Sequence, residues 1–302
     1  MRVIITGGTG FIGQNLVRTL LDSGNTPVVS TRNIEQARTK LGPDVQLVQT
    51  SDDAELVKAI SGSDGVVNLA GEPVLPARWT PEKKKRLVSS RVDFTQRIVS
   101  SIQNASERPK VLVSASAVGF YGHAAGGDPK TETADPAADF LAQLCVDWEA
   151  AAQEAEALDV RVCRVRIGLV LGEDGGALSQ MLTPFKMGVG GKMGSGRQYM
   201  PWIHVEDLVR MILAALENES FPSVVNGTAP TPVTNSTFTS ALGRVLNRPT
   251  FVPVPAFALK AMFGEAAVAL LGGQNAVPAA AQSHGFDFRF ADLDACLRDI
   301  LI

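Results

Sequence analysis

The chain has few of the residues that bind metals or form disulfides. Its 302 residues include three cysteines and three histidines. The cysteines are widely spaced and form no C-x-x-C pair, and the histidines have no ligand spacing. Zinc sites and disulfide frameworks need denser and more regular patterns. We therefore expect no metal centre and no disulfide, and free thiols suit a reducing, cytoplasmic environment.

The chain also lacks a strong charge excess and a long apolar segment. Its formal net charge is −3, whereas a surface that binds nucleic acid needs a basic excess. The apolar stretch 257–271 is interrupted by Lys260 and Glu265 and is too short to span a bilayer. We expect no signal peptide, no nucleic-acid partner and no membrane partner. The basic run Lys83–Arg86 lies on a predicted helix, where a solvent-exposed face is the favoured interpretation.

The most informative pattern is a short apolar strand followed by glycines at positions 7, 10 and 13. Gly7 permits a tight turn out of the strand, and Gly10 lets the backbone approach a pyrophosphate. Gly13 lets the following helix pack close to the sheet. Free N–H groups at the helix N-terminus favour the phosphate charge. The turn therefore predicts a dinucleotide site, the alternative being a glycine-rich turn without a ligand.

The residues that end the second strand indicate which dinucleotide is bound. Thr31 and Arg32 should lie beside the adenosine ribose. NAD sites usually place an acidic residue there to accept from the 2′-hydroxyl. A guanidinium instead suits a 2′-phosphate, through two parallel charge-assisted hydrogen bonds. We therefore predict NADP(H) rather than NAD(H), the alternative being that Arg32 is an ordinary surface arginine.

Strand-like and helix-like segments alternate along most of the chain, which predicts an α/β fold with a Rossmann-type, doubly wound parallel sheet. Residues 1–230 should form the cofactor-binding domain, with a lid-like insertion near 171–204. Within it, the glycine-rich segment 188–198 is either a flexible lid or a plain linker. Residues 231–302 should form a small, mainly helical cap that supplies substrate contacts. Strands are expected near 2–6, 27–31, 45–49, 65–70, 110–115, 160–167 and 223–227, and helices near 12–23, 34–41, 53–60, 81–104, 140–157 and 205–217.

These motifs resemble those of the extended short-chain dehydrogenases/reductases. Residues 6–13 match the T-G-x-x-G-x-x-G of that superfamily, and residues 68–71 match its N-x-A-G element. Within the superfamily the chain resembles an atypical branch, the epimerase-family, SulA-like proteins, which are described as nucleoside-diphosphate-sugar epimerases or cell-division-inhibitor homologues. The resemblance extends to the C-terminal part and rests on segments 68–73, 78–80, 90–92, 166–172, 188–191, 201–204, 248–249, 254–255, 273–274 and 285–288.

The resemblance implies a set of residues that contact NADP. Two of them, Leu69 and Ala70, end a strand over which the cofactor must pass. Arg91 could reach a phosphate or a ribose, or could be an ordinary salt-bridged helix arginine. Val170 follows the sixth strand, where a nicotinamide needs an apolar wall. The implied contacts are Thr9, Gly10, Phe11, Ile12, Thr31, Arg32, Leu69, Ala70, Arg91 and Val170, in addition to Gly7 and Gly13 of the turn.

The usual catalytic dyad of the superfamily is absent. Working members pair a tyrosine with a lysine four residues later, because the ammonium lowers the pKa of the phenol, which is ordinarily about 10. The chain has two tyrosines, Tyr121 and Tyr199, and neither is followed by a lysine at that spacing. The helix expected to carry the dyad offers no phenol and no ammonium around residues 140–145. Any catalysis must therefore use other groups.

Ser116 and Tyr121 are the candidate catalytic residues that remain. Ser116 stands near the position of the superfamily's catalytic serine and could orient a carbonyl or hydroxyl, or it could cap the strand end. Tyr121 could donate a proton as a neutral phenol, or it could form a wall of the substrate pocket. Trp202 and His204 are candidates for the pocket near the nicotinamide, although a histidine at a loop–helix junction is more often structural.

Two classes of function fit these observations. The favoured one is an NADP(H)-dependent oxidoreductase or epimerase-like enzyme that acts on a small polar substrate with a changed acid. The alternative is an NADP-binding regulatory or scaffold protein with little catalysis, which the missing dyad favours. A protein partner or a homodimer is compatible with either. Sugar-nucleotide epimerisation itself is less favoured, because it needs an effective base and such enzymes mostly hold NAD.

Overall fold

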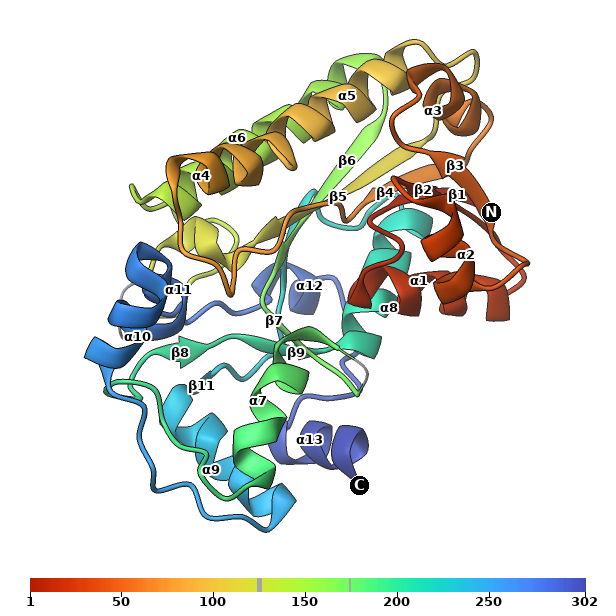
Figure 1. Ribbon diagram of the computed structural model, residues 1–302. Helices are drawn as coiled ribbons and strands as arrows, with labels where there is room; N and C mark the ends of the chain where they lie inside the picture. The colour runs from red at the N-terminus through yellow and green to blue at the C-terminus, as the bar shows by residue number, and fades with distance from the viewer. Residues whose placement is uncertain (124–126, 174) are drawn as a thin grey trace.

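A seven-stranded parallel sheet forms the centre of the computed structural model, which describes residues 1–123, 127–173 and 175–302 (Figure 1). The strand order β3-β2-β1-β4-β5-β6-β10 runs outward from β1 in both directions. This order confirms the doubly wound, Rossmann-type fold that the alternation predicts. The strands are β1 (Arg2–Thr6), β2 (Thr26–Thr31), β3 (Gln46–Gln49), β4 (Gly65–Asn68), β5 (Val111–Ala117), β6 (Arg161–Ile167) and β10 (Val224–Gly227).

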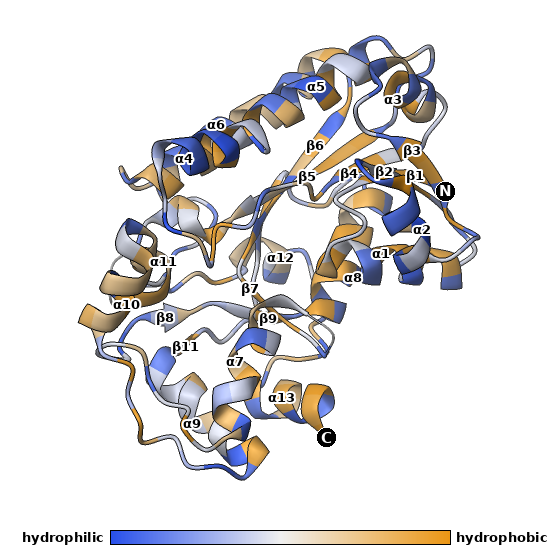
Figure 2. Ribbon diagram, viewed as in Figure 1, coloured by the Kyte–Doolittle hydropathy of each residue, from blue (hydrophilic) through white to orange (hydrophobic). Residues whose placement is uncertain are grey.

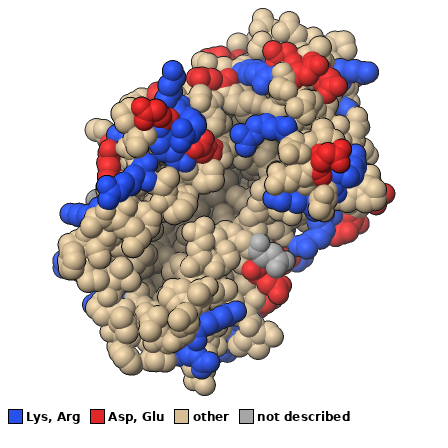
Figure 3. All heavy atoms as spheres, viewed as in Figure 1, with Lys and Arg blue, Asp and Glu red and all other residues tan. Residues whose placement is uncertain are grey.

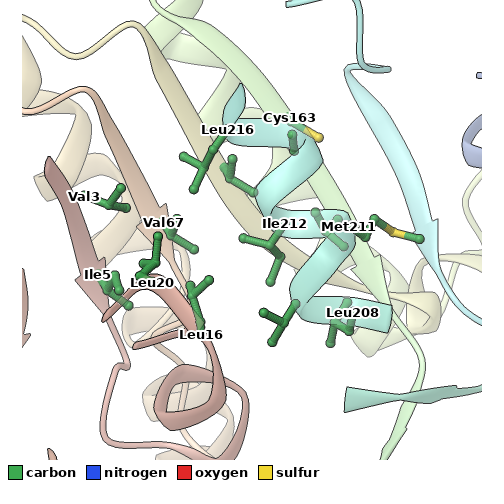
Figure 4. Close-up of a cluster of buried hydrophobic side chains, with 14 of the residues drawn as sticks. Val3, Ile5, Leu16, Leu20, Val67, Cys163, Leu208, Met211, Ile212 and Leu216 are labelled. Carbon is green, nitrogen blue, oxygen red and sulfur yellow. The ribbon is translucent and has the colours of Figure 1, made fainter. Parts of the chain in front are cut away.

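Helices cover both faces of the sheet, which explains why the central strands are apolar without alternation. On one face, side chains of α1 and α8 meet those of β1, β4 and β6 in a continuous apolar cluster (Figure 4). On the other face, α3, α5 and the turn after α6 pack over β1, β4 and β5. The helices around the sheet are α1 (Phe11–Asp22), α2 (Ile34–Leu41), α3 (Asp53–Ile60), α4 (Pro81–Ser89), α5 (Val92–Gln103), α6 (Phe140–Gln153) and α8 (Val205–Glu217).

The sequence locates these elements closely, with one error. Each predicted strand of the sheet matches the observed one to within two residues at either end. The single helix predicted over 81–104 is wrong, because the chain breaks into α4 and α5 at Ser90 and Arg91. There the Arg91 guanidinium turns back to donate to the carbonyl oxygens of Leu87 and Glu72. Periodicity could not reveal this break, since both residues are acceptable inside a helix.

A second apolar core lies in the C-terminal part of the chain. Side chains of α7 and β9 pack there with those of α9 and α13. The segment 171–204, of which residue 174 lies outside the described residues, therefore shares a core with the C-terminal helices. The domain division at residue 230 and the movement of a lid remain predictions. The further elements are β7 (Leu169–Leu171), α7 (Gly176–Lys186), β8 (Tyr199–Met200), β9 (Trp202–His204), β11 (Val233–Thr234), α9 (Asn235–Leu246), α10 (Ala256–Phe263), α11 (Val268–Leu271), α12 (Ala279–Ser283) and α13 (Leu293–Leu301).

The glycine-rich segment 188–198 is tied to the C-terminal region by backbone hydrogen bonds. Gly191 pairs with Phe251, and the Lys192 carbonyl oxygen accepts from the N–H of Val254 at 2.9 Å. The Gln198 carbonyl oxygen accepts from the N–H of Asn235 at 2.8 Å.

Within the part of the chain that the structure describes, no helix has the length and apolarity needed to cross a membrane.

Candidate active site

The glycine-rich turn joins β1 to α1 at the carboxyl edge of the sheet. Gly7 has a φ of +68°, and a Cβ there would lie 2.6 Å from the backbone of Leu69. A Cβ on Gly13 would collide with the backbone of Gly7 and Gly8. A Cβ on Gly10 would meet only the Gly7 carbonyl oxygen, at 3.2 Å, among the described atoms outside its helix. The protein itself thus requires Gly7 and Gly13, whereas a Cβ on Gly10 would make one tight contact, and the exposed backbone there leaves room for a phosphate.

Among the described residues, no side chain satisfies the free N–H groups in the first turn of α1. Its N-cap is Gly10, which provides no side-chain hydrogen bond, and no acidic residue lies in the turn. By contrast, the caps of α2 and α3, Asn33 and Asp52, each accept from a backbone N–H. Thr9, Phe11 and Ile12 around the turn are half-buried. The positive end of the helix dipole therefore has no anion of the described residues beside it, which fits a bound phosphate.

The side chain of Phe11 packs against three glycines that follow β7, a contact that sequence reasoning missed. Cβ atoms built on Gly172, Gly175 or Gly176 would lie 2.6 to 3.1 Å from its ring atoms. These glycines follow Val170, which is 9% exposed and lies in β7. The cluster of glycines after residue 171 is the signal that could have revealed the contact. Phe11 therefore holds the turn after β7 against the glycine-rich turn and brings Val170 to the same edge of the sheet.

Arg32 stands at the end of β2 with its guanidinium unpaired within the described residues. Its side chain is exposed, and the hydrogen bond that it makes with a described residue uses its backbone carbonyl oxygen, which accepts from Gln49 Nε2 at 3.3 Å. Thr31, which precedes it, is 9% exposed and accepts from the N–H of Asn33 at 3.2 Å. The Arg32 guanidinium thus makes no hydrogen bond or ion pair with the described residues, and it stands where a 2′-phosphate is expected.

The end of β4 is fixed by Asn68, a residue of the N-x-A-G element. Its Oδ1 accepts from Thr6 Oγ1 at 2.6 Å, and its Nδ2 donates to Thr95 Oγ1 at 2.8 Å. These bonds tie β4 to β1 and to α5, so Leu69 and Ala70 leave the strand in a defined direction. Both residues are half-buried, and Leu69 lies directly against Gly7. The strand end can therefore form a rigid floor beside the glycine-rich turn.

Arg91 is a half-buried cation that makes no ion pair with the described carboxylates. Its Nη2 donates to the carbonyl oxygen of Glu72 at 3.0 Å, and its Nη1 donates to that of Leu87 at 3.3 Å. Its guanidinium carbon lies 5.2 Å from the ring of Trp148 and 3.1 Å from a Cβ built on Gly71. Burial lowers the pKa of Arg91. A half-buried cation whose described partners are neutral oxygens is suited to an anionic or hydroxyl-rich ligand at the end of β4.

The hydroxyl of Ser116 is buried and already engaged. Ser116 is 2% exposed, and its Oγ donates to Glu149 Oε1 at 2.7 Å. Glu149, on α6, also accepts two hydrogen bonds from Arg166 of β6, at 2.8 and 2.9 Å. Because the hydrogen of Ser116 points to Glu149, its oxygen is free only to accept. The expected alternative, in which the serine caps a strand end, does not describe these contacts.

Tyr121 belongs to the same buried network. Its hydroxyl donates to Asn226 Oδ1 at 2.7 Å and accepts from Arg166 Nη1 at 2.9 Å. Burial raises the pKa of the phenol more than Arg166 and Asn226 lower it. The Arg166 guanidinium also lies 3.5 Å from the centre of the Phe120 ring. Glu149 and Arg166 were missed by sequence reasoning, although three arginines in the seven residues of a strand of the central sheet were a signal.

The part of α6 that is expected to carry the dyad, residues 140–145, has no phenol and no ammonium. Leu141 and Cys145 of α6 lie nearest to a Cβ built on Gly119, at 3.8 and 3.9 Å. Burial raises the pKa of the Cys145 thiol to about 12. The thiol is therefore protonated at neutral pH and is not an activated nucleophile.

Trp202 belongs to the C-terminal core, whereas His204 caps α8 and lines a hollow beside Phe11. Trp202 has no exposed surface, and its Nε1 donates to the Thr231 carbonyl oxygen at 3.0 Å. His204 Nδ1 accepts from the N–H of Glu206 and so caps α8, while its Nε2 lies 3.3 Å from Asp299. The burial of Trp202 does not support its place in a pocket wall, whereas a position of His204 near the nicotinamide stays a prediction.

The surface is hollowed between the part that carries α4 and α6 and the part that carries α7 and α9 (Figure 3). Its visible walls consist mostly of uncharged residues, and charged side chains lie at the rim (Figure 3). The predicted cofactor residues come from the ends of β1, β2 and β4, the start of α5, and β7, all near the carboxyl edge of the sheet. Ser116 and Tyr121 lie at the end of β5, within the protein.

Comparison with known proteins identifies relatives over the whole chain. Residues 3–226 match the model of the NAD dependent epimerase/dehydratase family, and residues 254–300 match a domain of unknown function (DUF1731). The chain is 44% identical to the chloroplastic SDR39U1 homologue of Arabidopsis thaliana, an epimerase family protein, over 100% of this chain and 87% of the relative. It is 38% identical to the epimerase family protein YfhF of Bacillus subtilis, over 100% and 98% of the two chains.

A solved structure is also similar over its full length. The crystal structure of the human epimerase family protein SDR39U1 with NADPH aligns with a TM-score of 0.89 and 35% sequence identity. The alignment covers 99% of this chain and 99% of the human one. The similarity therefore includes both the central sheet and the C-terminal region.

Proposed function

The chain belongs to the NAD dependent epimerase/dehydratase family, and from this premise we propose that it is an NADP(H)-dependent oxidoreductase or epimerase-like enzyme that acts on a small polar substrate. Residues 1–230 would bind the cofactor, and residues 231–302 would supply substrate contacts. The human relative was crystallised with NADPH, which supports this choice of cofactor. The expected cytoplasmic location stays a prediction, since the Arabidopsis relative is described as chloroplastic.

The observation that carries the proposal is the unpaired Arg32 beside an open glycine-rich turn. The pyrophosphate would lie on the N-terminus of α1 over Gly10, and the 2′-phosphate would be held by Arg32 and Thr31. On the other side of the turn, Arg91 would hold the nicotinamide half, over the floor formed by Leu69 and Ala70. The cofactor, when bound, supplies or accepts a hydride. The donor set fits an anionic dinucleotide because these cations have no carboxylate partner within the described residues.

The residues of the chain would perform the proton chemistry near the end of β5. Ser116 Oγ can accept a hydrogen bond from a substrate hydroxyl, because its own hydrogen is held by Glu149. Tyr121 stays neutral at physiological pH, because burial raises its pKa above the ordinary value. Its hydroxyl could donate to a substrate only if its bond to Asn226 opened. Ser116 is therefore the better placed of the two proposed catalytic residues.

A titration with reduced cofactor tests the cofactor assignment. We expect tighter binding of NADPH than of NADH, and Arg32→Asp should reverse this preference. Loss of charge-assisted bonds to the 2′-phosphate costs about 1.5–3 kcal/mol, or roughly ten- to a hundred-fold in the dissociation constant. Lys40→Asp is the matched control, because Lys40 is exposed on α2 and carries no proposed contact. An unchanged NADPH dissociation constant in Arg32→Asp would refute the role of Arg32.

A second candidate function is an NADP-binding regulatory protein with little catalysis. The burial of both candidate hydroxyls, and the absence of a phenol and an ammonium from residues 140–145 of α6, favour it. A panel of carbonyl compounds and sugar nucleotides separates the two functions. Turnover of NADPH that falls in Ser116→Ala, with cofactor binding intact, supports the enzyme. Tight NADPH binding without turnover of any compound supports the regulator.

A further inference from the structure

Exposed apolar side chains gather in one part of the molecule. Apart from the chain ends, the exposed large apolar side chains of the described residues all belong to the stretch after α7 or to residues 251–268. Phe251 and Phe257 are 80% and 75% exposed. We call this surface the apolar edge, and it includes Met187, Val189, Phe251, Val252, Phe257 and Met262.

The two stretches of the apolar edge lie side by side. Gly191 pairs with Phe251, and the N–H of Gly194 donates to the Val254 carbonyl oxygen at 2.9 Å. The chain then continues directly into α10, whose sequence is AFALKAMF. Of this apolar helix only Leu259 is buried. A helix that is apolar around most of its circumference is normally covered, so the exposure of α10 marks a contact surface.

The charges around the apolar edge are mostly positive, although Glu265 follows α10 and pairs with Lys84. Residues 175–205 and 235–264 contain six lysines and arginines and no aspartate or glutamate. Among the described residues, only Arg244 of these six makes an ion pair, with Asp294 at 2.7 Å. The adjacent basic helix α4 adds Lys85, which is exposed and also unpaired within the described part of the chain.

Two contacts join α4 and the residue Arg78 before it to α10 and the turn that follows it. Arg78 Nε donates to the Met262 carbonyl oxygen at 3.0 Å, and Lys84 pairs with Glu265 at 2.8 Å. The hydrophilic α4 and the apolar α10 accordingly lie close to each other at one side of the molecule (Figure 2). The basic run that the sequence assigns to a solvated helix face thus borders the apolar edge.

We propose that the apolar edge docks peripherally on an anionic lipid bilayer. Exposed phenyl and thioether groups would enter the boundary between headgroups and acyl chains, while the surrounding cations would face lipid phosphates and carboxylates. A second copy of the chain would bring cations against cations. A hollow at the C-terminal end of α9 is lined by polar residues such as Ser240, Asn247 and Thr250. This hollow therefore offers no apolar groove for a peptide. Such a contact would be peripheral and would not span the bilayer, and it would differ from the expectation of no membrane partner.

Flotation of the full chain with vesicles tests the proposal. One set of vesicles contains phosphatidylcholine with about one third phosphatidylserine, and the other contains phosphatidylcholine alone. We expect flotation with the anionic set at low salt and its loss at high salt, where exposed charges are screened. Phe257→Ser should weaken the partition by about tenfold or more, since it removes a phenyl group from the lipid. Lys85→Glu should weaken it as well.

Matched controls keep the result interpretable. Ile302→Ser removes an exposed apolar side chain at the chain end, and Lys58→Glu reverses an exposed charge on α3. Both should float like the parent protein. Because Phe257, Lys85 and the control residues are exposed, the variants should fold, and their thermal unfolding checks this. Absence of flotation with anionic vesicles would overturn the proposal, as would equal flotation of all variants. Self-association in vesicle-free solution that Phe257→Ser abolishes would overturn it too, and would assign the edge to a second copy.

Discussion

Removal of the Glu149 carboxylate should destabilise the protein strongly, because it leaves Arg166 charged and buried. The side chains of Glu149 and Arg166 are each 5% exposed, and Arg166 donates two hydrogen bonds to Glu149. Breaking such a buried pair on one side costs about 3–5 kcal/mol. This is a large part of the roughly 5–15 kcal/mol by which a domain is stable. Glu149→Ala should therefore shift the midpoint of urea unfolding far downward.

A double-mutant cycle tests the physical reason for this loss. Replacing both partners by apolar residues, as in Glu149→Leu with Arg166→Met, should cost much less than the sum of the two single changes. Urea titrations followed by far-ultraviolet circular dichroism give the four free energies of unfolding. Glu265→Ala is the matched control, because the pair that it breaks with Lys84 is 31% and 53% exposed and should contribute less than about 1 kcal/mol. Additive single and double effects would refute the argument that the buried pair acts as a unit.

Three further predictions concern packing, pH and thiol reactivity. Gly175→Ala should cost about 1–3 kcal/mol through overpacking, because a Cβ would lie 2.7 Å from the Phe11 ring. In thermal melts, the loss of stability caused by Gly175→Ala should be smaller in a Phe11→Leu background. Gly119→Ala should cause no loss, because the nearest atom to a Cβ there is 3.8 Å away. An equal loss from Gly175→Ala in both backgrounds would exclude Phe11 as the cause. Burial lowers the pKa of His204 below 6.5, so the unfolded state binds the proton first and stability should fall as the pH drops below that value. His204→Asn, which keeps a capping side chain, should flatten this dependence in melts between pH 7 and 5, and an unchanged slope would contradict the assignment. Burial raises the pKa of Cys145 and Cys163 to about 12 and also raises that of Cys296. Iodoacetamide should therefore label the native protein slowly, and it should label all three thiols in urea. Rapid labelling of the native protein would show that a thiol is accessible.

The local pattern of the chain was enough to predict the frame of the cofactor site. A β-strand, a glycine-rich turn and a helix follow one another within 22 residues, so their geometry depends on nearby residues. The apolar runs of the central strands likewise predict a sheet that is buried on both faces. The missing dyad was visible too, because it is a matter of spacing along one helix.

Other features depend on residues that are far apart in the chain. Glu149 looks like an ordinary polar residue of a helix, and only the packing of α6 on β5 and β6 brings it to Ser116 and Arg166. The break at Arg91 arises because its guanidinium finds the carbonyl oxygen of Glu72. Neither contact has a period or spacing that a sequence pattern could reveal.

The sequence by itself determined the doubly wound fold and the place of the cofactor turn, since both follow from local periodicity and from glycines that a turn requires. Only the tertiary structure decided that Ser116 and Tyr121 are held in a buried ionic network. Only the tertiary structure decided that Phe11 fills a space left by three later glycines, and that an apolar helix stays exposed beside a basic one. The reason is that burial and pairing depend on which distant segments meet, and this is settled when the layers pack together.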